Sequence, residues 1–450
     1  MQKDLSALRE ELTNRGIDVV RFLFLDVIGI PRSKDVLVSQ LEKVAHNGPA
    51  FSFGVLLTTA GGDVLEANNI ANDGYPDMVS RFVPESLTDI PWEKGLAYVI
   101  VDLVNPDGSP TLMAPRTVLK KVIEGYHKIG LQPVCGPELE FYIADHTPEG
   151  GYRRSLERTG RVYTTGSLVD PEGIFLNLLR MIDQLNIGAF AGNHEFAPGQ
   201  YEINLWHSEA LDAADRTFYF KTAIKDIVHR AGKHATFVGK PWSDEGGSGF
   251  HLHFSVTDMN GANLMHDGAG NLSSTAKQMI AGVTAHAPAL TALTNPSVNA
   301  FKRLGPDTLA PYRANWGFDN RSCMVRVPPE REGGTRLEVR VGDGMANPYL
   351  VTAGILAAAL DGIVRDLPCP DPAEGMSYDN EADPILPMSL SEALDALEAD
   401  DQLRTQLSEE LINIFTVMKR DEVARYAAAV KDPSTREVTD WEVNEYFADF

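Results

Sequence analysis

The chain has 450 residues and a formal net charge of −23, with 40 Lys and Arg against 63 Asp and Glu. Its composition, 43% hydrophobic and 23% charged, is that of a globular protein and excludes a disordered or collagenous chain. The acidity argues against nucleic acid and anionic membrane surfaces as partners, because phosphate binding needs clustered Lys and Arg. Its three cysteines form no CxxC pair, which excludes a zinc knot and a disulfide framework.

The start of the chain predicts a cytoplasmic protein. Residues 1–16 are charged and helical in pattern, without the apolar core of a signal peptide. No apolar run reaches the roughly 18 residues that a membrane helix needs. We therefore expect a cytoplasmic protein without a membrane partner.

The N-terminal part predicts a small domain of its own. Apolar spacing predicts a helix over 4–16, and β-rich composition predicts a strand over 19–29. The Gly-rich stretch 46–73 is too long for an ordinary connection, so we expect it to be functional or to face a partner. An apolar strand over 96–104 ends at the turn sequence NPDGSP. Because this length favours two domains, we place domains at 1–110 and 111–450.

The remaining chain mixes helices and strands without regular βαβ alternation, which favours an α+β fold. Helical spacing predicts helices over 114–130, 174–185, 214–234, 274–294, 348–367 and 389–407, with another helix after the last. Strands are predicted over 134–145, 235–241, 249–258 and 335–343, and two strand pieces around a tight turn over 194–205.

Charged residues spaced by two in these strands are the strongest chemical signal. Alternate residues of a strand point to the same face, so each of three pairs projects together. The pairs are Glu138 with Glu140, His251 with His253, and Glu338 with Arg340, and Glu195 and Glu202 flank the turn APGQ. Clustered carboxylates repel unless a cation lies between them. Oxygen ligands suit Mg²⁺ or Mn²⁺, an imidazole favours Mn²⁺ or a mixed site, and paired divalent ions serve phosphoryl transfer. Any single pair is more often one face of a half-exposed sheet.

A local concentration of arginines is the second signal. Guanidinium groups bind carboxylate and phosphate through two hydrogen bonds, although any one arginine can equally form a surface salt bridge. The run comprises Arg303, Arg313, Arg321, Arg326, Arg331, Arg336 and Arg340. The sequence has neither a Walker P-loop nor a GxGxxG turn, so bound ATP would be held by metals and arginines.

Seven ordered motifs resemble the signatures of the glutamine synthetase family, type I in length. They are GPELEFY, NHEFAPGQYEINL, GGSGFHLHFS, NAFKRL, DNRS, RLEVR and ANPYL. The resemblance implies an N-terminal β-grasp domain and a catalytic domain with an antiparallel sheet and flanking helices. It also implies a homo-oligomer, commonly a dodecamer of two hexameric rings, with active sites between neighbouring subunits.

The resemblance also implies roles for individual residues. Glu140, Glu195 and Glu202 match the ligands of one metal ion, and Glu138, His251 and Glu338 match those of a second. Arg321 and Arg340 match arginines that hold the phosphates during catalysis, together with Glu338. Arg326, Arg336, Ser255 and His253 match the ATP site, and Arg303, Gly247, His251 and Arg340 match the glutamate site.

The implied reaction has two steps. The γ-carboxylate of glutamate attacks the γ-phosphate of ATP and gives an acyl phosphate, and an amine then displaces phosphate. Metals, Mg²⁺ or Mn²⁺ with at least two ions in each site, and arginines neutralise the developing charge. Water has to be excluded while the acyl phosphate exists.

The chain departs from the family where ammonium would bind. Ammonia-using members carry FDGS and a flap glutamate in a GYEAP-like motif. Here Ser52 and Phe53 in PAFSFG replace the aspartate and the glycine, and Leu309 in GPDTLAP replaces the glutamate. Gly246 also replaces an asparagine that contacts glutamate.

We therefore expect an organic amine that packs against Phe53 and Leu309, as in the branch that makes γ-glutamyl amides. Polyamines, ethanolamine, alkylamines and aromatic amines are the options, and the apolar replacements favour an alkyl or aryl monoamine.

Three other functions compete with this hypothesis. One is an ordinary glutamate–ammonia ligase, and another is an inactive structural relative, against which the complete set of metal ligands argues. The third, a guanidino kinase, rests on fold analogy alone. Tyr378 lies where some relatives carry a regulatory adenylylated tyrosine, but its context MSYDNEADP departs from theirs and favours a plain surface-loop tyrosine.

Overall fold

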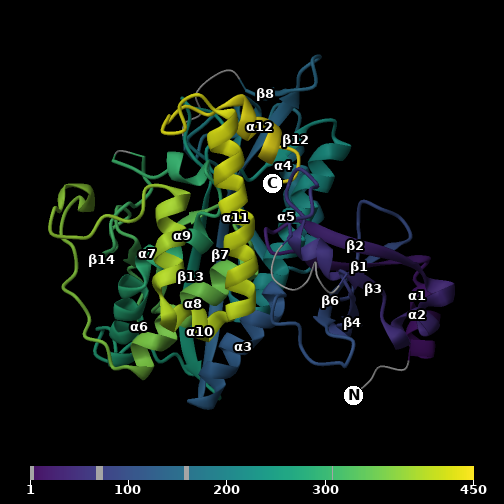
Figure 1. Cartoon of the computed structure of the whole chain (residues 1–450), viewed down its shortest axis with the longest axis horizontal. Helices are drawn as coiled ribbons and strands as arrows, with labels where there is room; N and C mark the ends of the chain where they lie inside the picture. The colour runs from purple at the N-terminus through teal and green to yellow at the C-terminus, as the bar shows by residue number, and fades with distance from the viewer. Residues whose placement is uncertain (1–4, 67–73, 157–161, 307) are drawn as a thin grey trace.

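The computed structural model describes residues 5–66, 74–156, 162–306 and 308–450. Two β-sheets with surrounding helices make up this part of the chain (Figure 1). This confirms the α+β class. No helix in the described part is both long and apolar enough to cross a bilayer.

The N-terminal sheet has six strands in the order β2-β1-β6-β4-β3, with β5 paired to β6. β1 and β6 run parallel, whereas the other pairs are antiparallel. The strands are β1 (Val19–Leu25), β2 (Pro31–Leu37), β3 (Ala50–Ser52), β4 (Asp77–Phe82), β5 (Thr88–Asp89) and β6 (Leu96–Val104), beside helices α1 (Leu5–Asn14) and α2 (Leu41–Asn47). Within the stretch 46–73, β3 leads into a short 3₁₀ helix, Phe53–Leu57, while residues 67–73 lie outside the described part.

The second sheet has ten strands and carries the candidate site. Its main order is β14-β15-β16-β13-β7-β10-β9, and β8, β11 and β12 also pair with β7. Its strands are β7 (Leu131–His146), β8 (Tyr152–Arg154), β9 (Ala189–His194), β10 (Gln200–Leu205), β11 (Ser208–Glu209), β12 (His234–Thr236), β13 (Gly249–Asp258), β14 (Trp316–Phe318), β15 (Val325–Val327) and β16 (Leu337–Asp343). All pairs are antiparallel except β14 with β15.

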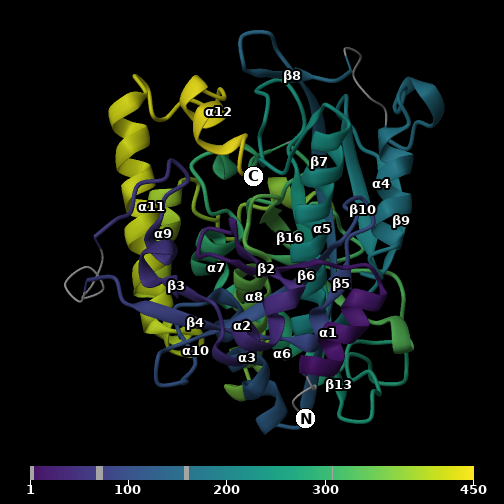
Figure 2. The same cartoon turned by 90° about the vertical axis from the view of Figure 1, so that its right-hand side faces the viewer.

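Helices cover this second sheet and form much of the core. Nearly all of α8 is buried, as its apolar sequence PYLVTAGILAAALDGIV requires, and it contacts α3, α5 and α6. Figure 2 shows α9 and α11 on one side of the molecule and β7, β9 and β10 on the other. The helices are α3 (Pro115–Lys128), α4 (Ile174–Asp183), α5 (Ala210–Arg230), α6 (Ser274–Ala285), α7 (Ala287–Thr294), α8 (Pro348–Val364), α9 (Leu390–Ala399), α10 (Asp401–Leu407), α11 (Glu409–Ala429) and α12 (Asp440–Tyr446).

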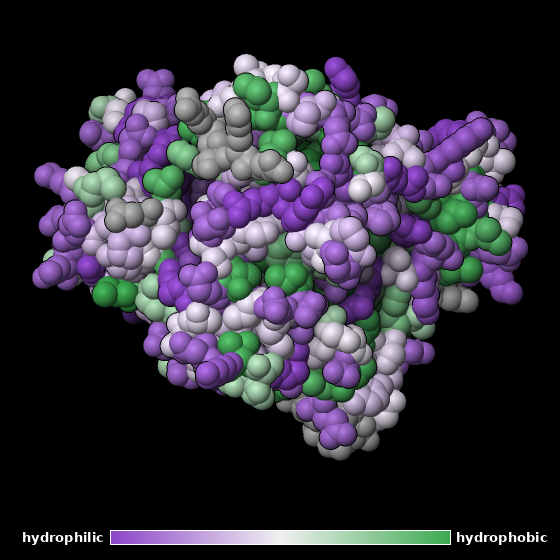
Figure 3. Space-filling view, turned by 90° about the horizontal axis from the view of Figure 1, so that it is seen from above, coloured by the Kyte–Doolittle hydropathy of each residue, from purple (hydrophilic) through white to green (hydrophobic). Residues whose placement is uncertain are grey.

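Three local expectations need correction. The helix expected over 389–407 is two helices, α9 and α10, because the Asp400 side chain begins a second helix by accepting from Leu403 N at 3.0 Å. The helix expected over 274–294 is two helices, because His286 ends α6 and Pro288 begins the next turn. Tyr378 is not a surface-loop residue, since it is 6% exposed and its ring stacks on Tyr312 with centroids 5.8 Å apart. The face drawn in Figure 3 is mostly hydrophilic, with small separate groups of hydrophobic residues.

The proposed boundary near residue 110 falls between the two sheets in sequence. β6 ends at Val104 and α3 begins at Pro115. The domain limits 1–110 and 111–450 stay a prediction.

Candidate active site

Strand register brings the spaced pairs onto one face of the second sheet. His251 on β13 lies opposite Glu138 on β7, and His253 lies opposite Glu338 on β16. On the other side of β7, Glu140 lies opposite Glu202. Directly opposite residues point to the same side of a sheet, so four strands contribute to one acidic cluster.

The cluster has the dimensions of a cation site. His251 Nδ1 lies 3.8 Å from Glu138 Oε2, and its Nε2 lies 4.0 Å from Glu140 Oε1. Donor atoms of Glu138, Glu202 and His251 lie within 4.8 Å of one another, and so do those of Glu138, His253 and Glu338. Carboxylate and imidazole ligands in this arrangement suit Mg²⁺ or Mn²⁺.

The electrostatics of the carboxylates support this assignment. Burial, followed by the charges of Glu138, Glu140 and Glu195, raises the pKa of Glu202 to about 9. Burial and Glu140 likewise raise the pKa of Glu195 to about 7. Two carboxyl groups are thus held back from ionising by their acidic neighbours, and divalent cations would relieve that repulsion. The residues present therefore fit the metals that the family resemblance implies.

Glu338 lies at the other end of the cluster, between two arginines. Arg326 Nη1 donates to its Oε2 at 2.7 Å, and Arg340 Nη1 donates to its Oε1. Burial alone would raise the pKa of Glu338, but Arg340 and the nearby histidines lower it to about 2. In this arrangement Glu338 is a counter-ion of the arginines, so metal ligation by Glu338 would compete with two ion pairs.

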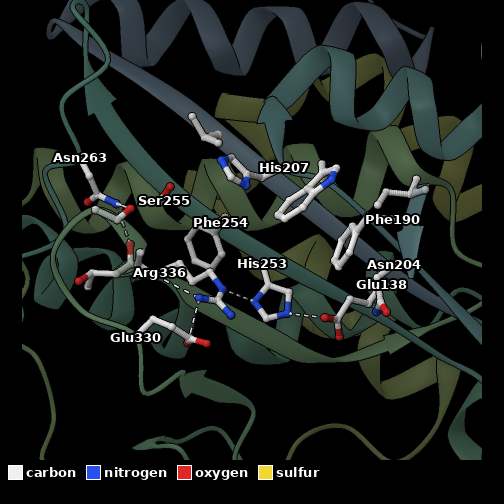
Figure 4. Close-up of a pocket in the computed structure, with 17 residues that line it drawn as sticks. Glu138, Phe190, Asn204, His207, His253, Phe254, Ser255, Asn263, Glu330 and Arg336 are labelled. Atoms are coloured by element: carbon white, nitrogen blue, oxygen red, sulfur yellow. Dashed lines mark hydrogen bonds and ion pairs between the residues drawn. The ribbon is translucent and has the colours of Figure 1, made fainter. Parts of the chain in front are cut away.

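A cavity of about 330 Å³ lies along β13 and extends away from the cluster. Figure 4 shows Arg336, His253 and Glu138 in a row, with Arg336 Nε 3.1 Å from His253 Nδ1 and His253 Nε2 3.1 Å from Glu138 Oε1. Ser255 lines the same cavity, and so does the exposed aromatic ring of Phe190.

A second cavity of about 720 Å³ holds most of the predicted site residues. It shares Glu138, Phe190, His253 and Arg336 with the first cavity, so the two form one continuous cleft. The predicted residues that line it are Glu138, Glu140, Glu195, Glu202, Gly247, His251, His253, Arg303, Leu309, Arg321, Arg326, Arg336 and Arg340.

Close packing fixes the part of this cavity around Arg303. Arg303 is 5% exposed, and its Nη1 donates to the carbonyl of Val341 at 3.0 Å. A Cβ atom on Gly247 would lie 2.6 Å from Arg303 Cγ and 2.6 Å from the carbonyl of Gly239. Glycine is therefore required at residue 247 for the backbone to approach the arginine.

The loop that carries Leu309 forms the mouth of the larger cavity. Leu309 is 56% exposed and has φ of 61°, a left-handed conformation that leucine rarely adopts. The exposed rings of Tyr163 and Phe196 line the same cavity. The exposed part of the lining thus includes three large apolar side chains beside the charged Arg321 and Glu330, and the buried part carries both carboxylates and arginines.

The structure does not place Ser52 and Phe53 in this cavity. Phe53 is 7% exposed and packs in the N-terminal core, so its ring offers little surface to an amine. Ser52 is exposed, and its hydroxyl accepts from Gly54 N at 3.2 Å. A role for these two residues at a subunit interface stays a prediction.

Sequence reasoning missed three polar residues whose side-chain amides donate hydrogen bonds to the carboxylates of the acidic cluster, the carboxylate cage. Gln200 donates to Glu140 Oε2 at 3.1 Å and to the carbonyl of Gly247 at 2.9 Å. Asn193 donates to Glu195 at 2.8 Å, and Asn204 donates to Glu202 at 3.0 Å. Gln200 and Asn204 each lie two residues from Glu202, so the same spacing argument could have identified them.

Comparisons with known proteins agree with the motifs. Residues 112–446 match the model of the glutamine synthetase catalytic domain. A glutamine synthetase of Halobacterium salinarum is 32% identical over 457 residues, which cover 99% of this chain and 96% of that protein. The gamma-glutamylputrescine synthetase PuuA of Escherichia coli is 32% identical over 429 residues, 92% of this chain and 90% of that one. A solved GmaS/ADP complex superimposes with a TM-score of 0.85 at 31% identity, covering 98% of this chain and 99% of that chain.

Proposed function

Because this chain belongs to the glutamine synthetase family, we propose that it is an ATP-dependent ligase that joins the γ-carboxylate of glutamate to an organic amine. The family makes it a ligase. Relatives named glutamine synthetase and one named gamma-glutamylputrescine synthetase are equally similar to it, so the choice of amine rests on the site.

The exposed Leu309 at the cavity mouth carries the proposal. Family members that use ammonia have a glutamate at this position, which attracts ammonium and takes up its proton. A leucine can do neither, but its side chain can pack against the carbon chain of a larger amine. Tyr163 and Phe196 extend this apolar surface. We therefore favour an alkyl or aryl monoamine over a polyamine, whose second ammonium would need a carboxylate.

The remaining site residues would have separate roles along the cleft. Arg303 and the backbone at Gly247 would hold glutamate, and Arg321 and Arg340 would neutralise charge on the phosphoryl group during transfer. Arg326, Arg336, His253 and Ser255 would hold the nucleotide. Two divalent ions in the carboxylate cage, when bound, would supply Lewis-acid charge neutralisation. The site would be completed by a neighbouring subunit in a ring assembly, and we expect a dodecamer.

The reaction proceeds through a γ-glutamyl phosphate. A γ-carboxylate oxygen attacks the γ-phosphorus of ATP and releases ADP. The amine nitrogen then attacks the acyl carbon, loses a proton and expels phosphate. Because no carboxylate stands at residue 309, the amine has to arrive in its neutral form or lose its proton to another group.

Phosphate release with glutamate, ATP and a panel of amines tests the proposal. Ammonium, ethanolamine, putrescine, isopropylamine and aniline span the options, and we expect one of the last two to give the highest kcat/KM. The highest value with ammonium would instead identify an ordinary glutamine synthetase. No turnover with any amine would favour an inactive relative.

Leu309→Glu tests the residue that carries the proposal. We expect kcat/KM for ammonium to rise and that for the preferred organic amine to fall, so that their ratio changes by about tenfold or more, since a carboxylate restores ammonium binding. Met259→Glu is the matched control, because Met259 is equally exposed, at 60%, in the turn after β13. An unchanged ratio in Leu309→Glu would contradict the role of this residue.

A further inference from the structure

The segment around Arg303 is held from behind by the last turns of the chain. Arg303 directly follows a short 3₁₀ helix, Ala300–Lys302, and the side chain of Lys302 enters a buried polar network. Figures 1 and 2 both show α12 beside the upper end of α11, where this network lies. The network joins the glutamate side of the site to residues 436–442.

Glu442 is the centre of this network. Its Oε2 accepts from Lys302 Nζ at 2.5 Å, and its Oε1 accepts from Asn299 Nδ2 at 2.8 Å. Lys302 Nζ also donates to the carbonyl of Glu437 at 2.6 Å. Glu442 is 1% exposed and Asn299 is fully buried, so neither contact can be replaced by bulk water.

The carboxylate of Glu442 also caps the first turn of α12, the helix to which it belongs. Glu442 is the N3 residue of the capping box that begins α12, in which its Oε2 accepts from Thr439 N at 2.8 Å. One side chain therefore joins the start of α12 to the segment that precedes Arg303. Asn299 extends the connection, because it exchanges hydrogen bonds of 2.8 and 2.9 Å with the backbone of Lys240.

Arg436 makes a second, independent connection. Its guanidinium donates to the carbonyls of Phe301, Lys302 and Leu304 at 3.0, 3.0 and 2.7 Å. Arg436 itself is exposed, so the contact depends on geometry and not on burial of the arginine. Leu304 also begins the loop that carries Leu309 at the cavity mouth.

We propose that Glu442 and Arg436 are positioning residues for glutamate, which act by fixing the segment 299–304 and thereby the Arg303 guanidinium. This inference rests on the proposed function, in that Arg303 is taken to bind glutamate. Neither residue lines either cavity. Arg303 packs closely against Gly247, where a Cβ atom would lie 2.6 Å from its Cγ, so a small displacement of its segment alters the glutamate pocket first.

The nucleotide side should respond differently. Arg336 and Ser255 lie on or beside β13 and β16, and among the described residues no hydrogen bond or ion pair joins them to the segment 299–304 or to α12. Loosening of the network should therefore raise KM for glutamate and leave KM for ATP unchanged. A residue that merely stabilised the fold would change both constants, or neither.

Steady-state kinetics of Glu442→Gln and Arg436→Gln test the inference, with glutamate and ATP varied separately. We expect KM for glutamate to rise about tenfold or more in each variant, with KM for ATP within about twofold of the parent. Glu445→Gln is the matched control, because Glu445 lies on the same helix but pairs with Arg425 at 2.8 Å. We expect both constants to stay unchanged in this control.

Several outcomes would overturn the inference. It fails if KM for glutamate stays within about twofold of the parent in Arg436→Gln, or if KM for ATP rises by the same factor. Should Glu442→Gln not fold, as judged by thermal unfolding, the exposed Arg436 variant decides alone. Each assay is run with ammonium and with the preferred organic amine. The glutamate effect should appear with both, so a preference for ammonium would refute the proposed function without affecting this result.

Discussion

The pair Gly246 and Gly247 offers a one-atom test of the glutamate site. A Cβ atom added at Gly247 would lie 2.6 Å from Arg303 Cγ and from the carbonyl of Gly239, and 2.8 Å from Arg303 Cδ. Ordinary contact starts near 3.4 Å, so the arginine or the backbone has to move by about 0.8 Å. Arg303 cannot rotate into solvent, because it is 5% exposed and its guanidinium donates a hydrogen bond to the carbonyl of Val341 on β16.

A displacement of about 1 Å at a positioning group costs about 100-fold in rate. For Gly247→Ala we therefore expect kcat/KM for glutamate to fall by about that factor, mainly through KM. Gly246→Ala is the neighbouring control, since its Cβ would lie no closer than 3.6 Å to Gln200 Oε1. Initial rates of phosphate release at varied glutamate measure both variants. Equal kinetics of the two alanine variants would refute the role assigned to Arg303 and Gly247.

Three further predictions concern the metal cage and the stability of the fold. Glu140→Ala should lower phosphoryl transfer by about 100-fold or more, with circular dichroism and oligomer size unchanged; retained turnover would argue against the metal assignment. Because burial and acidic neighbours raise the pKa of Glu202 to about 9, Mg²⁺ has to displace a proton there below that pH. The affinity for Mg²⁺, measured by calorimetry, should therefore rise about eightfold from pH 7.5 to 8.5 and level off above pH 9, and Glu202→Gln should lose this dependence. An affinity of the parent that does not change with pH would show that no proton is displaced at Glu202. Burial alone would lower the pKa of His286, but hydrogen bonds to Asp400 and Asp361 raise it. The imidazolium thus stabilises the fold fully below about pH 6.5 and loses this contribution as pH rises through its raised pKa. As pH rises from about 6.5 through this raised pKa, the difference in thermal unfolding temperature between the parent and His286→Gln should shrink. A constant difference over this pH range would show that His286 does not titrate there.

Local periodicity made the acidic face of the second sheet predictable. The alternation in ELEFY and HLHFS depends only on the strand itself, so it identified Glu138 with Glu140, and His251 with His253, as pairs on one face of their strand. Register depends on contacts between distant segments. The sequence therefore could not show that Arg326 and Arg340 both pair with Glu338.

Edge strands and loops were harder to predict. β2 reads PRSKDVL and is mostly exposed, so it lacks the apolar alternation on which strand prediction depends. The strands β14 and β15 have three residues each, which is too short for an alternating pattern to identify them. The start of α12 was predictable in principle, because Thr439 and Glu442 have the spacing of a capping box.

The loop at the cavity mouth also shows which features the sequence can predict and which depend on packing. Sequence comparison with the family motif identified Leu309 as a replaced glutamate, and the structure places it at the mouth of the cleft. The parallel expectation for Phe53 depended on its exposure, which only the packing of the N-terminal core determines.

A direct competition between ammonium and an organic amine tests the central claim most simply. The enzyme is given glutamate, Mg·ATP and equal concentrations of ¹⁵N-ammonium and isopropylamine or aniline, and the γ-glutamyl products are separated by mass spectrometry. The account predicts that the γ-glutamyl amide of an organic amine exceeds ¹⁵N-glutamine. An excess of ¹⁵N-glutamine over every organic amide would contradict it.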